Sequence, residues 1–225
     1  MKKFLRILLV WIPLGFIALS LLQVTLHKWA PVRLTPLMVE RCIQGTATFS
    51  GTIGRKWVPL EDISPRLIRA ILASEDARFF RHKGFDLIEL KVMKEKHEKK
   101  GKPIRGCSTL SQQTAKNCFT WCTHTWVRKA FEAYYTVLIE KIWGKRRIAE
   151  VYLNVVETGP GLFGVESASQ TYFRTSAAKV GYADAAAIAC CLPNPIKRNP
   201  SWVRRYMSTR RSEIEVIARQ TGLEF

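Results

Sequence analysis

Residues 68–86 read IRAILASEDARFFRHKGFD. Ser64 and Pro65 precede this stretch and predict a helix start, because serine can cap a helix and proline in the first turn loses no hydrogen bond. The helical period continues to Gly84, a residue typical of a helix end. One face of this predicted helix carries Ile68, Ile71, Leu72, Phe79 and His82.

Glu75 lies in the middle of that apolar face. Burying an unpaired carboxylate is costly, so an inward-facing glutamate is either paired or lines a cleft in which it is used. A competing interpretation is that Glu75 and Asp76 form a solvated acidic pair on an exposed turn. The residue pattern by itself leaves both interpretations open.

Four motifs follow one another along the chain. They read EDARFFRHKGFD (75–86), GCSTLSQQTAKN (106–117), RKAFE (128–132) and RIAEVYLN (147–154). Their order resembles the motif series of the peptidoglycan glycosyltransferases, glycosyltransferase family 51, over residues 65–200. Two positions depart from the family pattern: Cys107 replaces a usual Gly or Ala, and Ser111 replaces a usual Thr.

The resemblance implies a mainly α, lysozyme-like domain with a small membrane-facing subdomain. It also implies an enzyme that polymerises lipid II into glycan strands by inverting transfer, forming a β-1,4 linkage and releasing undecaprenyl diphosphate. Such a transfer needs one base and cations for the diphosphate, whereas a glycosidase needs two carboxyl groups. Two rival functions are a lytic enzyme that cuts glycan and a non-catalytic membrane scaffold.

The resemblance also assigns the site residues. Glu75 is the expected general base, and Glu132 is the second catalytic carboxylate. The expected supporting residues are Asp76, Phe79 and His82. The residues expected to bind sugar and diphosphate are Ser108, Thr109, Gln112, Gln113, Lys116, Asn117 and Arg128.

Two roles remain open for Glu132. It orients Lys116 or Arg128, or it binds a divalent ion such as Mg²⁺ or Mn²⁺ that bridges the diphosphate; no cofactor is expected to be obligatory. A zinc site at Cys118, Cys122 and His124 is disfavoured, because a second ligand pair at zinc-like spacing is missing.

Residues 7–26 form an apolar run preceded by Lys2, Lys3 and Arg6. A helix of this length spans about 30 Å, enough to cross a bilayer. The positive-inside rule then places the N-terminus in the cytoplasm and the catalytic domain in the periplasm, with a single pass through the cell inner membrane. We expect an anchor over residues 1–27 and a glycosyltransferase domain over residues 28–225; a cleaved signal peptide is the less favoured alternative.

The formal net charge is +18. A positive charge of this size usually suggests nucleic-acid binding, but a domain outside the cytoplasmic membrane would not meet nucleic acid. We therefore expect the partners to be the membrane, lipid II and the lipid-linked glycan strand. Cell-division or elongation proteins are further candidate partners.

The remaining segments predict several elements. Residues 46–53 suggest an extended segment or hairpin, residues 94–105 a solvated loop or mobile flap, and residues 159–164 a turn. Helices are expected over residues 126–143, 148–155, 165–173, 177–192 and 202–219.

Two features suggest other chemistry but are weak. Ser176-x-x-Lys179 matches a transpeptidase nucleophile motif without its usual partner motifs, and residues 175 and 176 resemble helix caps, so we expect a monofunctional enzyme. Cys190 and Cys191 lie in an alanine-rich run and are expected to be buried free thiols.

Overall fold

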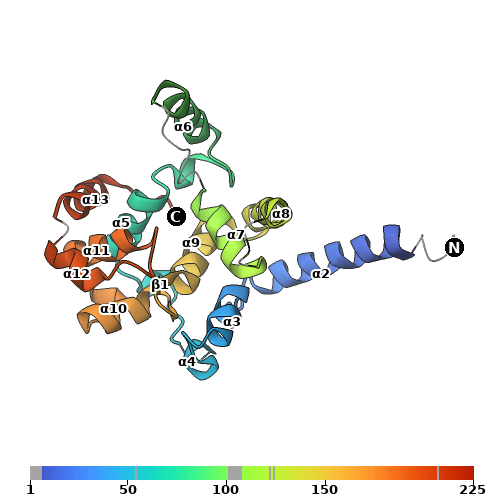
Figure 1. Cartoon of the computed structure of the whole chain (residues 1–225), viewed down its shortest axis with the longest axis horizontal. Coiled ribbons are helices and arrows are strands. Elements are labelled where there is room, and N and C mark those ends of the chain that lie inside the picture. The colour runs from blue at the N-terminus through green and yellow to red at the C-terminus, as the bar shows by residue number, and fades with distance from the viewer. Residues whose placement is uncertain (1–6, 54, 101–107, 122, 124, 207) are drawn as a thin grey trace.

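The computed structural model describes residues 7–53, 55–100, 108–121, 123, 125–206 and 208–225. Figure 1 shows a mainly α-helical body from which one N-terminal helix projects. The longer helices are α2 (Ile12–Leu26), α3 (Pro36–Ile43), α5 (Pro65–Glu75), α6 (Leu87–Lys100), α7 (Leu110–Phe119), α8 (Trp126–Ile142), α9 (Gly144–Val155), α10 (Val165–Phe173), α11 (Tyr182–Cys191) and α13 (Ser208–Gln220). The shorter elements are η1 (Ile7–Trp11), α4 (Phe49–Ile53), η2 (Leu60–Asp62), η3 (Phe79–Arg81), β1 (Glu157–Gly159), β2 (Leu162–Phe163), η4 (Ala177–Lys179) and α12 (Pro200–Tyr206).

The core forms around α9 and α11. Tyr152 and Ile148 of α9 are fully buried, and α9 lies between the α5, α10 and α11 group on one side and α7 and α8 on the other (Figure 1). Residues 185–191 of α11 are all buried, and four of them are alanine. Because small side chains let helices approach closely, α11 packs against α5, α12 and α13 together.

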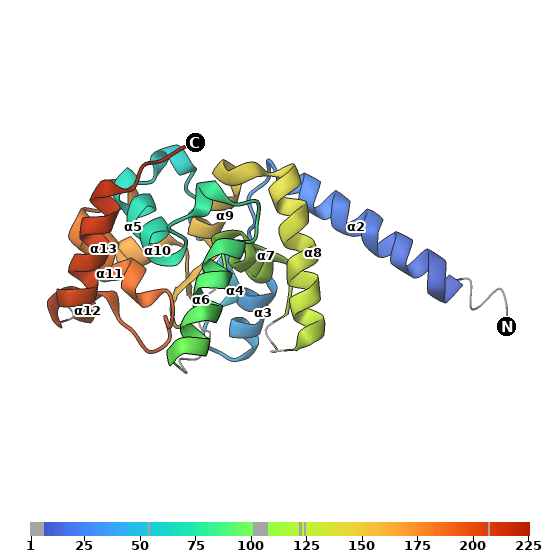
Figure 2. The same cartoon turned by 90° about the horizontal axis from the view of Figure 1, so that it is seen from above.

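The end of η1 and helix α2 together form an apolar helical stretch, Leu9–Leu26, that is long enough to cross a membrane. It projects from the body in both views (Figures 1 and 2), yet its C-terminal half is docked on α8. The Ser20 Oγ lies 2.6 Å from the Tyr134 Oη, and the Phe16 ring lies edge-on to Phe131 at 5.4 Å. This helix is therefore held at a set position against the domain.

The helix predicted to run to Gly84 is shorter than expected. α5 ends at Glu75, because the backbone of Asp76 leaves the helical region (φ −161°, ψ 74°) and its side chain bonds to distant groups. Pro65 does lie in the first turn, but the Ser64 hydroxyl donates to the carbonyl of Val180 instead of capping the helix.

The prediction of an extended segment or hairpin at residues 46–53 is wrong. Residues 49–53 form α4, whose first turn is closed by a hydrogen bond from Gly51 N to Thr48 Oγ1. The hairpin of the fold is instead β1–β2, an antiparallel pair. The turn predicted at residues 159–164 is narrower than expected: residues 160 and 161 form it between β1 and β2, with Gly161 at positive φ.

The prediction of a loop at residues 94–105 is wrong for residues 94–100. α6 continues to Lys100, because lysine and glutamate are good helix formers and Lys94 and Glu98 pair four residues apart at 4.0 Å. In Figure 1, α6 stands away from the other helices. The rest of the predicted flap, residues 101–105, lies outside the described residues.

The helices predicted at residues 126–143, 148–155 and 165–173 are confirmed as α8, α9 and α10. The helix predicted over 177–192 divides into η4 and α11, and the basic helix over 202–219 divides into α12 and α13. The hydroxyl of Ser176 makes no capping bond, so its predicted role as a cap is wrong.

Candidate active site

Glu75 ends α5 and is half-buried. Its Oε2 accepts a hydrogen bond from the side-chain amide of Gln113 in α7 at 3.0 Å. Burial raises the pKa of the Glu75 carboxyl above its usual value, and neighbouring Asp76 adds to this rise. The Gln113 hydrogen bond and the charges of Arg210 and Lys116 act in the opposite direction. The inward carboxylate predicted from sequence is confirmed, and the solvated-pair interpretation is wrong.

Asp76 and His82 form hydrogen bonds that hold the end of α5, where Glu75 lies. The Nε2 of His82 lies 3.0 Å from Asp76 Oδ2, and the backbone N–H of Leu110 donates to the same oxygen at 2.8 Å. The Nδ1 of His82 accepts from Gly84 N at 3.2 Å, so Nε2 carries the proton and donates to Asp76. Asp76 thereby joins the end of α5 to the start of α7.

Phe79 completes this support. Its ring is buried, lies edge-on to His82 at 6.3 Å, and carries the Lys145 ammonium over its face at 4.4 Å. The structure therefore brings Asp76, Phe79 and His82 together next to Glu75, as their shared motif predicts. The contacts of these three side chains are with other groups of the protein.

Helix α7 begins with a capping box. The N–H of Gln112 donates to Thr109 Oγ1 at 3.2 Å, and the N–H of Thr109 donates to Gln112 Oε1 at 3.0 Å. The Thr109 hydroxyl also donates to the carbonyl of Gly84 at 2.6 Å. Both side chains are buried, so these two predicted substrate-binding residues build the helix start; Ser108, half-buried beside them, lines a recess.

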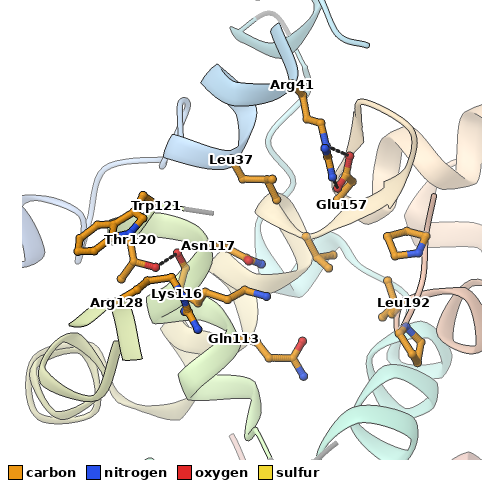
Figure 3. A pocket seen from close by; sticks show the side chains of 13 residues that line it. Leu37, Arg41, Gln113, Lys116, Asn117, Thr120, Trp121, Arg128, Glu157 and Leu192 are labelled. Carbon is orange, nitrogen blue, oxygen red and sulfur yellow. Dashed lines mark hydrogen bonds and ion pairs between the residues drawn. The ribbon is translucent and has the colours of Figure 1, made fainter. Parts of the chain in front are cut away.

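A cationic pocket of about 280 Å³ opens on one side of Gln113 (Figure 3). Lys116 extends into it from α7, and Arg128 and Asn117 also line its wall. Apolar side chains and prolines supply the rest of the lining, together with the paired Arg41 and Glu157. The remaining lining residues are Leu37, Thr120, Trp121, Val156, Leu192, Pro193 and Pro195.

A second, acidic recess of about 240 Å³ contains Glu75. Asp76, Asp86 and Glu89 also line it, and Arg78 pairs with Asp86 at 2.8 Å. Gln113 lines the cationic pocket and donates to Glu75, which lines the recess, so one hydrogen bond joins the walls of the two spaces. The carboxylate thus lies in the acidic recess, one hydrogen bond away from a residue of the cationic pocket.

Glu132 is buried and is paired with two cations. Its Oε2 accepts from Arg128 Nη1 at 2.6 Å, and its Oε1 pairs with the Lys129 ammonium. Of the two predicted roles, the geometry supports the orientation of Arg128. Both carboxylate oxygens of Glu132 are already paired with a cation, and the divalent-ion alternative stays a prediction.

Two residues that contact predicted site residues, Lys129 and Tyr152, were not identified from the sequence. Lys129 lies in the quoted RKAFE motif, three residues before Glu132, and this spacing could have identified it. Tyr152, which lies in the quoted RIAEVYLN motif, donates its hydroxyl hydrogen to Gln113 Oε1 at 3.1 Å. That contact joins residues 39 positions apart in sequence, and no local pattern indicates it.

Cys190 and Cys191 are buried free thiols, as predicted. Cys118 is also free and fully enclosed, and burial raises its thiol pKa to about 12. Such a thiol is a poor metal ligand, because metals bind the thiolate. Cys122 and His124, the other two residues of the disfavoured zinc site, lie outside the described residues.

Residues 44–220 match the transglycosylase family model. The chain belongs to the transglycosylase family. It is 47% identical over 201 residues to a biosynthetic peptidoglycan transglycosylase of Bacteroides thetaiotaomicron, covering 88% of this chain and 80% of that protein. Proteins with the same description from Caulobacter vibrioides and Bdellovibrio bacteriovorus are 43% and 51% identical, covering 95% and 80% of this chain and 90% and 72% of their own lengths.

These relationships make the protein a peptidoglycan transglycosylase and confirm the family predicted from the four motifs. The mainly α architecture agrees with this family assignment. The apolar helix α2 is consistent with a single membrane anchor for a cell-wall enzyme.

Proposed function

We propose that this transglycosylase polymerises lipid II into glycan strands, with Glu75 as the base and the cationic pocket as the site of the diphosphate. The observation that carries this proposal is the hydrogen bond from Gln113, which lines the cationic pocket, to Glu75, which lines the acidic recess. In an inverting displacement the attacking hydroxyl and the leaving diphosphate lie on opposite sides of C1, so the base and the diphosphate site must flank the same sugar.

The proposed reaction is a single inverting displacement. The 4-hydroxyl of the acceptor N-acetylglucosamine attacks C1 of N-acetylmuramic acid on the lipid-linked donor, and Glu75 accepts the hydroxyl proton. The C1–O bond to undecaprenyl diphosphate breaks, so an α linkage becomes a β-1,4 linkage. The leaving diphosphate takes the electron pair, and cations stabilise its developing charge.

Lys116 and Arg128 are the cations that we assign to the diphosphate, because both line the pocket next to Gln113. Glu132 holds Arg128 through its 2.6 Å ion pair and is assigned an orienting role. Asn117 lines the same pocket and Ser108 the acidic recess, so we assign them to sugar or phosphate oxygens. The proposal uses no divalent ion.

The anchor fits a substrate that stays in the membrane. We propose that α2 crosses the cell inner membrane once, with the N-terminus in the cytoplasm and the domain from residue 28 onward in the periplasm. We also propose that the enzyme has no transpeptidase activity, since the Ser176-x-x-Lys179 motif occurs in this sequence without its usual partner motifs. Labelled penicillin should therefore leave the protein unlabelled.

The test is polymerisation of labelled lipid II by the detergent-solubilised protein and by Glu75→Gln. We expect the wild type to make glycan strands and the variant to bind lipid II without polymerising it. Glu98→Gln, at an exposed carboxylate of α6 that lines neither space, is the matched control and should polymerise.

Three other results would contradict the proposal. A Glu75→Gln variant that polymerises as the wild type does would remove Glu75 as the base. Release of sugar fragments from preformed glycan, without polymerisation, would favour the lytic enzyme. Binding of lipid II without any reaction by the wild type would favour the scaffold.

A further inference from the structure

Tyr152 of α9 has a fully buried side chain whose hydroxyl contacts a residue of the active site. This hydroxyl donates to Gln113 Oε1 at 3.1 Å. The other end of the Gln113 amide donates to Glu75 Oε2 at 3.0 Å and to the carbonyl of Ser108 at 3.4 Å. Helices α9, α7 and α5 thus contribute one residue each to a continuous hydrogen-bonded chain.

The Gln113 side-chain amide has a donor group and an acceptor group, so its orientation matters in this hydrogen-bonded chain. Its NH₂ donates and its oxygen accepts, whereas an ionised carboxylate such as Glu75 only accepts. Turning the amide over would place its oxygen against the carboxylate and remove the hydrogen bond. The carboxylate therefore selects the orientation in which the NH₂ faces it, and the Tyr152 hydroxyl, by donating to Oε1, holds the amide at that place.

We propose that Tyr152 is a positioning residue for glycosyl transfer, which holds the Gln113 amide with its NH₂ directed at Glu75 and so sets the orientation of the base. This inference rests on the proposed role of Glu75. It gives the buried tyrosine of the YLN motif a part in the chemistry besides its packing in the core.

The phenol is suited to act as a permanent donor. Burial raises the pKa of Tyr152 well above its ordinary value, and the nearby charges of Glu75 and Asp76 raise it further. The hydroxyl therefore keeps its proton throughout the range in which Glu75 ionises. Its hydrogen bond to Gln113 does not change with pH in that range.

Several charged groups face Glu75 from the surrounding helices. Asp76 follows it in the chain, Lys116 lies on α7, and Arg210 lies on α13. Replacing Tyr152 with phenylalanine leaves all three charges in place and removes one hydroxyl. A change in the Glu75 pKa in that variant would therefore report the loss of the Gln113 hydrogen bond.

The experiment compares full-length wild type and Tyr152→Phe in detergent. The pKa of Glu75 is measured by carbon-13 NMR titration, with its signal assigned from Glu75→Gln, and kcat for lipid II polymerisation is measured across pH. We expect the Glu75 pKa to rise and kcat to fall about ten-fold at neutral pH, a barrier change of about 1.4 kcal/mol. Because the base must be ionised, the acidic limb of the rate profile should move to higher pH.

Two further variants make the test specific. Tyr135→Phe removes a hydroxyl from another buried tyrosine that lines neither pocket, and it should behave as the wild type does. Gln113→Ala alone should raise the Glu75 pKa, and adding Tyr152→Phe to it should change neither that pKa nor kcat further. Such non-additivity is expected only if Tyr152 acts through Gln113.

The inference is overturned if Tyr152→Phe lowers kcat equally at every pH and leaves the Glu75 pKa unchanged. It is also overturned if the effects of the two substitutions add, or if Gln113→Ala leaves the pKa unchanged. The NMR titration needs no substrate, so it tests the link from Tyr152 through Gln113 to Glu75 independently of turnover. A wild type that fails to polymerise lipid II would instead contradict the proposed function.

Discussion

The imidazole of His82 and the carboxylate of Asp76 form a buried hydrogen bond, with Nε2 3.0 Å from Oδ2. Leu110 N donates to the same carboxylate at 2.8 Å, so Asp76 links the end of α5 to the start of α7. These two helices carry Glu75 and Gln113. The position of the proposed base therefore depends on a carboxylate that makes its contacts inside the protein.

Asp76→Asn should destabilise the protein by about 2 kcal/mol, because hydrogen bonds to a charged group are worth more than neutral ones and an NH₂ group cannot accept them. Chemical denaturation of the detergent-solubilised protein measures this loss. Asp62→Asn, at an exposed aspartate, is the control and should change little. If both variants were equally stable while only Asp76→Asn lost activity, Asp76 would act on the substrate instead.

Glu132 offers a second test, because it is the buried partner of Arg128 and Lys129. Glu132→Gln removes the negative charge and leaves a buried arginine uncompensated, which should cost about 3 kcal/mol of stability. The matched control is Glu98→Gln, which breaks an exposed pair of the same four-residue spacing with Lys94 and should cost at most about 0.5 kcal/mol. Thermal and denaturant unfolding measure both.

Equal stability of the two variants would contradict this account of Glu132. If Glu132→Gln also abolished polymerisation and added Mg²⁺ changed the activity of the wild type alone, the metal-binding alternative would be favoured. We expect Mg²⁺ to have no such selective effect.

Much of the fold follows from local patterns in the sequence. The apolar period of residues 126–143 and 165–173 predicts α8 and α10 almost to the residue, and the run of residues 7–26 predicts α2. The inward position of Glu75 also follows from its place between apolar residues. In each case the deciding interactions lie within a few helical turns.

The errors arise where distant residues decide the structure. α5 ends at Glu75 because Asp76 bonds to Leu110, 34 residues further along the chain. The orientation of Gln113 depends on Tyr152, which is 39 residues away. No periodicity in either segment contains this information, so the helix end and the hydrogen-bonded chain required the structure.

The stability of the protein should depend on pH through Glu75. Its folded-state pKa is raised above the usual 4.5, so its contribution is fully present below that pH and is lost as pH rises through the folded pKa. Glu75→Gln should therefore be more stable than wild type at neutral pH, by on the order of 1 kcal/mol. This advantage should disappear below about pH 4.

Thermal unfolding of both proteins from about pH 4 to about pH 8 measures this difference. Glu89→Gln should show no comparable advantage, because Glu89 is exposed. An advantage for Glu75→Gln that grew toward acidic pH would have the wrong sign and would show that the folded protein stabilises the ionised form.

Docking of α2 on α8 gives the last prediction. Ser20 is only 2% exposed, and its hydroxyl lies 2.6 Å from that of Tyr134, so a large side chain at position 20 cannot fit between the helices. Ser20→Trp should cost about 1–3 kcal/mol, as overpacking commonly does, and should lower the melting temperature of the full-length protein in detergent. Leu19→Trp, at a neighbouring position that is 66% exposed, is the control and should leave it unchanged. Equal melting temperatures for both variants would mean that α2 is a flexible tether; a selective loss would mean that the anchor stabilises the helix that carries Arg128 and Glu132.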